Sequence, residues 1–91
     1  MTPSDVRVIL IKAVDDWVLV ADRPALAKRL ADPDEDVRFD ELDVDSLAAA
    51  EISIAIEDQT GYACDLADFL TYPSIRSLSD HIAAQLAEAR T

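Results

Sequence analysis

The order of hydrophobic and polar positions along the chain predicts helices. In residues 45–60, Ile52 and Ile56 lie one helical turn apart, and small apolar residues occupy the preceding turn. After Pro73, a second amphipathic pattern begins, with Ser74 as the expected N-cap. Both segments are therefore predicted to be helices with one face in the core. The core-facing residues are Ala48 or Ala49, Ile52, Ile56, Ile75, Leu78, Ile82 and Leu86.

A shorter helix is predicted between these two. Gly61, the only glycine, is placed to end the helix over 45–60 in a left-handed conformation. Leu66, Phe69 and Leu70 then suit one or two helical turns before Pro73. His81, the sole histidine, neighbours the apolar stripe of the last helix, and we expect a partly exposed surface residue and not a catalytic base.

The pattern of the first segment, from Ser4 to about Ala21, fits two structures. One set of apolar residues has helical spacing, with Ser4 as a candidate N-cap. A second set lies off that stripe, and its β-branched content also fits two short strands that meet at Asp15 and Asp16. A helix this apolar needs cover, either from the connecting segment or from a dimer contact. The first set is Val6, Ile9, Leu10, Ala13, Trp17 and Val20, and the second is Val8, Ile11, Val14, Val18 and Leu19.

Residues 21–44 form a long connection that contains Pro24, a possible helical turn over 25–30 and an acidic run over 32–36. Asp32, Asp34 and Asp36 have the spacing of a calcium loop. However, Val37 stands where that loop needs glycine and Asp43 stands where it needs glutamate, so we predict a solvated acidic loop and no metal. Residues expected to anchor the connection to the core are Leu26, Leu30, Val37, Phe39 and Leu42.

Composition limits the function. The 91 residues suit one domain, and 51% of them are apolar, enough for a core. A net charge of −11 disfavours nucleic acid and anionic membranes as partners and favours proteins with basic patches. The single cysteine, Cys64, forms no internal disulfide, fits a reducing cytoplasm and is expected to be a small buried hydrophobe. Neither a signal peptide nor a membrane span is recognisable.

The most informative stretch is the junction at residues 42–47, where the acidic connection meets the helix over 45–60. Asp45 is the expected N-cap, which leaves Ser46 in the first turn. The positive end of a helix favours an anion such as a phosphodiester. Serine and aspartate also occur at helix starts simply as caps, so the pattern alone leaves that alternative open.

Three stretches resemble the acyl and peptidyl carrier protein family. They are residues 39–47, with the motif Asp45-Ser46-Leu47, residues 56–61 and residues 68–78. The resemblance implies an all-α four-helix bundle of the acyl-carrier type, with a long first loop, a short third helix and the first segment helical and antiparallel to the second helix. It further implies that residues 1–91 are a single, free-standing carrier domain. Asp43 departs from the family, which usually has glycine there, although aspartate tolerates the left-handed conformation well.

By resemblance, Ser46 receives a 4'-phosphopantetheine arm from coenzyme A through a phosphopantetheinyl transferase, with Asp45 beside it. The protein is then a monomeric cytoplasmic carrier without catalytic residues. Its expected partners are the transferase, acyl or aminoacyl ligases and ketosynthases. Its expected cargo is a thioester intermediate of polyketide or other natural-product synthesis. The alternatives are an aminoacyl or peptidyl carrier of a nonribosomal peptide pathway, and an acidic helical interaction module without an arm. Residues matching the family's partner-docking positions are Leu47, Ala50, Glu51, Ile54, Glu57 and Asp58; Ala48 stands where many carriers have an acid, and Leu47 and Ile54 could instead be core residues.

Overall fold

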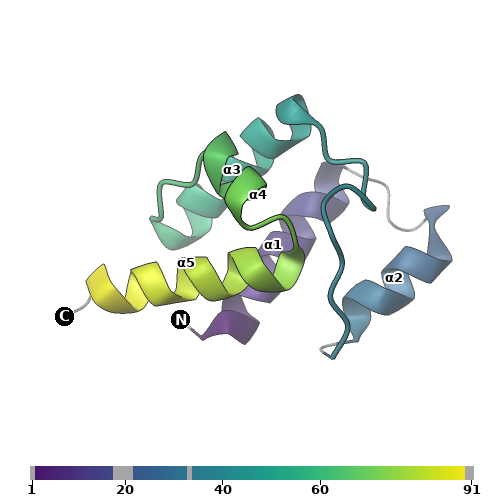
Figure 1. Cartoon of the computed structure of the whole chain (residues 1–91), viewed down its shortest axis with the longest axis horizontal. Helices are drawn as coiled ribbons and strands as arrows, with labels where there is room; N and C mark the ends of the chain where they lie inside the picture. The colour runs from purple at the N-terminus through teal and green to yellow at the C-terminus, as the bar shows by residue number, and fades with distance from the viewer. Residues whose placement is uncertain (1, 18–21, 33, 90–91) are drawn as a thin grey trace.

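A computed structural model describes residues 2–17, 22–32 and 34–89, which form five helices (Figure 1). The four expected helices are present, so the predicted all-α carrier-type bundle with a short third helix is confirmed. The long connection holds a fifth helix where only a turn was expected. The helices are α1 (Pro3–Trp17), α2 (Pro24–Ala31), α3 (Ser46–Thr60), α4 (Leu66–Thr71) and α5 (Ile75–Ala89).

The first segment is a continuous helix over Pro3–Trp17, so the two-strand alternative is wrong. α1 and α3 run in opposite directions in Figure 1. The expected cap, Ser4, is also wrong. Thr2 caps α1: its Oγ1 accepts from the Asp5 N–H at 3.2 Å, while Asp5 Oδ2 accepts from the Thr2 N–H at 3.0 Å. The helix therefore begins at Pro3, a favoured first position. Val18, Leu19, Val20 and Ala21, predicted as part of this segment, lie outside the described residues.

The core lies between α1, α3 and α5. α1 packs on both of the other long helices, and its buried face is centred on Leu10 and Val14. Trp17, which was placed on the buried stripe, is 48% exposed, and Ile9 is only partly buried. Val14, assigned off the stripe, is fully buried instead. The buried side chains of α3 and α5 include those predicted, Ile52, Ile56, Ile75, Leu78 and Ile82, with Leu86 partly buried.

Local signals fix the ends of the last three helices. Gly61 ends α3 with φ of 80°, a left-handed conformation that glycine adopts without strain. Asp65 and Asp68 form a capping box at the start of α4. Ser74 Oγ accepts from the Ser77 N–H at 3.2 Å and so caps α5, as predicted. These ends set where α4 can lie between its two longer neighbours.

The connection between α1 and α3 packs against the bundle through the side chains predicted to anchor it. Leu30, Val37, Phe39 and Leu42 are buried, and Leu26 is partly buried. Backbone bonds from the Phe39 N–H to Pro73 O and from the Ile75 N–H to Val37 O, both 2.9 Å, join the connection to the start of α5. Within the described residues, no helix combines the length and apolar character needed to cross a membrane.

Candidate functional site

Ser46 is the first residue of α3, and its side chain is exposed. The cap is supplied by its neighbour: Asp45 Oδ1 accepts from the Ala48 N–H at 2.8 Å, and Asp45 O accepts from the Ala49 N–H at 2.8 Å. Asp45 is therefore the N-cap and Ser46 lies in the first turn, as predicted. Its hydroxyl makes no hydrogen bond to any other described residue. An exposed, unengaged hydroxyl thus sits on a helix end whose dipole favours negative charge.

The turn that leads into α3 depends on a strained residue. Asp43 has a φ of 57°, in the left-handed region that glycine occupies most easily. Arg23, immediately before α2, contacts the Asp43 carboxylate at 2.6 Å. The turn itself closes through Phe39 O, which accepts from the N–H groups of Leu42 and Val44 at 3.1 Å. Aspartate therefore fills the position where the family usually has glycine, with an arginine bound to its side chain.

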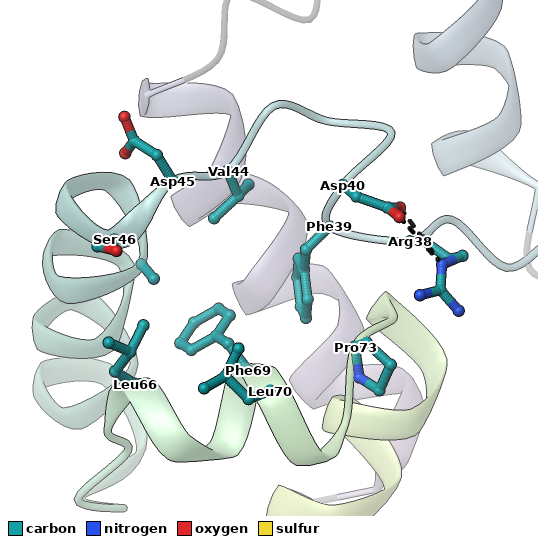
Figure 2. Close-up of a pocket in the computed structure, with 11 residues that line it drawn as sticks. Arg38, Phe39, Asp40, Val44, Asp45, Ser46, Leu66, Phe69, Leu70 and Pro73 are labelled. Atoms are coloured by element: carbon teal, nitrogen blue, oxygen red, sulfur yellow. Dashed lines mark hydrogen bonds and ion pairs between the residues drawn. The ribbon is translucent and has the colours of Figure 1, made fainter.

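A hollow of about 520 Å³ opens beside Ser46, between the start of α3, α4 and the connection (Figure 2). Its aromatic floor is the pair Phe39 and Phe69, whose ring centroids are 4.9 Å apart. Arg38 and Asp40 form an ion pair of 3.3 Å at its rim. An apolar group carried near the Ser46 hydroxyl would therefore meet an apolar surface. The other lining residues are Val44, Asp45, Ala49, Leu66, Leu70 and Pro73.

A second hollow, of about 350 Å³, lies next to the first. Ser46 and Leu66 line both hollows. Cys64, at the edge of the second hollow, is half-buried, and its burial raises the pKa of the thiol to about 11. The thiol is thus neutral at physiological pH, but Cys64 is only partly buried, so the prediction of a buried hydrophobe is wrong.

The predicted docking residues lie on the outer face of α3. Leu47 is 64% exposed and Ile54 is 56% exposed, so the alternative that they are core residues is wrong. Ala50, Glu57 and Asp58 are exposed, and Glu51 is partly exposed.

α4 also contributes exposed leucines to this face, and they were not among the docking residues predicted from the sequence. Leu66 is 45% exposed and Leu70 is 76% exposed, while Phe69 alone is buried from that helix. The available signal was the spacing of Leu66 and Leu70, one turn apart on a helix too short to bury them together with Phe69.

Two carboxylates of the acidic run accept hydrogen bonds from backbone N–H groups. Asp32 Oδ1 accepts from the Asp34 N–H at 2.9 Å, and Asp36 Oδ1 accepts from the Arg76 N–H in the first turn of α5 at 2.9 Å. Over residues 2–17, 22–32 and 34–89, no three histidine, cysteine or acidic side chains are grouped so that they could hold a metal ion.

Comparison with known proteins gives one result. A family model described as "Phosphopantetheine attachment site" matches residues 23–82, which include α2, α3, α4 and the first half of α5. No curated protein and no solved structure gives a significant match. The matched segment spans both hollows, and Ser46 lies between its ends.

Proposed function

Because the chain belongs to the family of phosphopantetheine attachment domains, we propose that Ser46 is the residue that carries its covalent 4'-phosphopantetheine arm. The observation that carries this assignment is the exposure of the serines in the matched segment. Ser46 is exposed, whereas Ser53, Ser74 and Ser79 are buried. Ser77 is partly buried and bonded to Ser74 at 2.9 Å. Ser46 is therefore the serine that a modifying enzyme can reach without unfolding the bundle.

The surroundings of Ser46 fit a phosphodiester. In the attachment step, the Ser46 oxygen bonds to the phosphorus of the phosphopantetheine half of coenzyme A, its proton is lost, and the nucleotide half leaves. Asp45 occupies the Ala48 N–H, and the remaining first-turn N–H groups and the helix dipole favour the negative charge. The arm's thiol then supplies the thioester chemistry, while the protein delivers the cargo at a high effective concentration to a docked enzyme.

We propose that partner enzymes bind a docking surface made by α3 and α4 around Ser46. It is apolar at its centre and acidic at its edge, which suits an apolar patch fringed by Lys and Arg on a partner. The partners proposed are a phosphopantetheinyl transferase, an acyl or aminoacyl ligase and a ketosynthase. The docking surface comprises Leu47, Ala50, Glu51, Ile54, Glu57 and Asp58 of α3 with Leu66 and Leu70 of α4.

The proposed cargo is an acyl intermediate of polyketide or other natural-product synthesis, carried by a cytoplasmic monomer. The apolar lining of the hollow beside Ser46 supports an acyl group. Loading assays separate this cargo from its alternative. Transfer of an acyl group to the armed protein by an acyltransferase, with no transfer of an amino acid by adenylating ligases, is expected. The reverse pattern would assign an aminoacyl or peptidyl carrier.

Attachment is tested by incubating the protein with coenzyme A and a broad-specificity phosphopantetheinyl transferase, followed by intact-mass measurement. We expect wild type to gain one arm, Ser46→Ala to gain none, and the control Ser4→Ala, an exposed serine outside the matched segment, to gain one. An arm on Ser46→Ala would refute the assignment of the residue. A wild type that gains no arm would favour the interaction module.

A further inference from the structure

The short helix α4 is attached to the bundle by unusually little apolar surface. It has six residues, too few for a helix that is stable alone, and Phe69 is its only buried residue. The Phe39–Phe69 contact holds one side of α4, and the bond from the Phe39 N–H to Pro73 O holds the chain just after it. A further contact on the α5 side would help to fix the orientation of α4, and with it the two exposed leucines beside Ser46.

A cluster of polar and aromatic side chains supplies that contact. The Tyr62 hydroxyl donates to Asp68 Oδ2 of α4 at 3.1 Å and lies 3.1 Å from Nε2 of His81 on α5. A phenol has one proton to donate, so His81 Nε2–H is the donor in the second bond. The Asp68 carboxylate also lies 4.0 Å from His81 Nε2. Tyr62 thus bridges an acid on α4 and an imidazole on α5.

The same cluster holds both ends of α4. Asp68 Oδ2 also accepts from the Asp65 N–H at 3.2 Å, within the capping box that begins the helix. Tyr72, which ends α4, stacks on the His81 ring at 4.1 Å with 16° between the planes. Because Asp68 and His81 are each only 19% exposed, these bonds are partly shielded from water and worth more than surface contacts.

The Tyr62 hydroxyl is suited to donate a hydrogen bond at every physiological pH. Burial, followed by the neighbouring Asp68 carboxylate, raises the pKa of Tyr62 above its ordinary value. Tyr62 therefore keeps its proton, and can donate it, throughout the physiological pH range.

We propose that Tyr62 is a positioning residue for arm attachment: its hydroxyl, joined to Asp68 and His81, orients α4 and thereby the Leu66 and Leu70 part of the docking surface. The inference rests on the proposed function, because orientation of α4 matters only to partners that dock beside Ser46. It assigns a role to three residues, in the loop after α3, in α4 and in α5, that line neither of the two hollows beside Ser46.

The chain offers a matched pair of variants. Tyr62→Phe removes the bridging hydroxyl and keeps the ring. Tyr72→Phe removes a hydroxyl that bonds to no described residue and keeps the stacking on His81. His81→Phe, a third variant, keeps a ring on Tyr72 but breaks the α5 side of the bridge. All three substitutions preserve an aromatic ring, so the bundle is expected to fold in each case.

Two measurements test the proposal: amide hydrogen exchange of residues 70–72, and the steady-state kinetics of arm attachment by the transferase. For Tyr62→Phe, we expect exchange in α4 to accelerate about tenfold, from the loss of a bond to a charged group, with α1 and α5 unchanged. KM for the protein should rise about twofold, since a smaller fraction has α4 in place, while kcat stays constant. His81→Phe should shift both in the same direction by less, and Tyr72→Phe should shift neither.

The outcomes separate the two proposals. Failure of wild type to accept an arm would refute the proposed function. If wild type accepts the arm but Tyr62→Phe shows wild-type exchange in α4 and wild-type KM, the positioning role is refuted. Equal effects from Tyr72→Phe would also refute it, because they would show that loss of any nearby hydroxyl suffices. A fall in kcat without a change in KM would place the effect at Ser46 and overturn the role assigned to α4.

Discussion

The three long helices and the connection between α1 and α3 are held in place by different interactions. α1, α3 and α5 bury stripes of aliphatic side chains against each other. The connection has single buried anchors, and arginines fix the chain between them. Arg7 donates to the carbonyls of Leu30, Asp32 and Glu35 at 3.3, 3.0 and 3.1 Å, and Arg29 contacts Glu41 at 2.8 Å. Charge pairs and side chain-to-backbone bonds therefore shape the chain that leads to Ser46.

The difference has a functional meaning. Apolar packing is insensitive to salt and pH, whereas exposed charge pairs are weak and are screened by salt. The packing of the three long helices is consequently expected to persist under changes of salt and pH that disrupt the local structure of residues 34–43. The following substitutions test that contrast, beginning with the largest expected effect.

Ile52→Ala should destabilise the scaffold most. Ile52 is fully buried on α3, and its truncation should lower the free energy of unfolding by about 2–5 kcal/mol through lost burial and a residual cavity. Ile54→Ala, two residues along and 56% exposed, is the matched control and should change it by less than about 0.5 kcal/mol. Urea denaturation measures both. Similar losses for the two variants would contradict the burial described for α3.

Arg7→Met should have a smaller effect that is concentrated in the connection. The substitution keeps an aliphatic chain on α1 but leaves three carbonyls without their donor, at a cost of about 1–2 kcal/mol. Amide exchange in residues 34–36 should accelerate more than exchange in α3. The control is Lys12→Met, because Lys12 is exposed on the same helix. Uniform acceleration throughout the bundle would show that Arg7 supports the core and not the connection.

Glu41→Gln should have the smallest effect, and one that depends on pH. The Arg29 guanidinium, followed by the Arg38 N–H, lowers the pKa of Glu41 below its ordinary value of 4.5. An acid with a lowered pKa contributes stability above its unfolded pKa, and this contribution is lost as the pH falls through the folded pKa. Wild type should therefore be more stable than Glu41→Gln at pH 7.

The stability difference should shrink as the pH falls below the ordinary pKa of the glutamate and disappear below the lowered pKa of the folded state. Thermal unfolding of the two proteins across pH measures it, with Glu57→Gln, an exposed acid on α3, as the control. A difference between wild type and Glu41→Gln that persists unchanged in acid would contradict the Arg29–Glu41 pairing. Added salt at neutral pH should reduce the difference for the same electrostatic reason.

Much of the helical structure follows from local rules. The cap at Asp45, the left-handed Gly61 and the cap at Ser74 depend on a residue and its neighbours within one turn, and all three are as predicted. The buried anchors of the connection were predicted because large apolar residues in a polar segment are stabilised by burial in the core. These anchors are Leu30, Val37, Phe39 and Leu42. Ser46 was identified by its motif and its position at a helix start.

Other features were not predictable from neighbouring residues. Thr2, and not Ser4, caps the first helix, which begins at Pro3; both residues can cap, and only the register of α1 in the core decides between them. Val14 displaces Trp17 from the buried face for the same reason. The turn expected over 25–30 becomes a full helix, α2, since Leu30 is buried and Arg29 finds partners at Glu35, Asp36 and Glu41.

Local periodicity and capping chemistry thus established where the helices lie and which serine begins α3, because such effects act within about one helical turn. The cluster of Tyr62, Asp68 and His81 arises from contacts that join the loop after α3, α4 and α5. Such contacts depend on how three helices pack, and no spacing along the sequence records that packing. The orientation of α4 beside Ser46 is accordingly a property of the folded bundle alone.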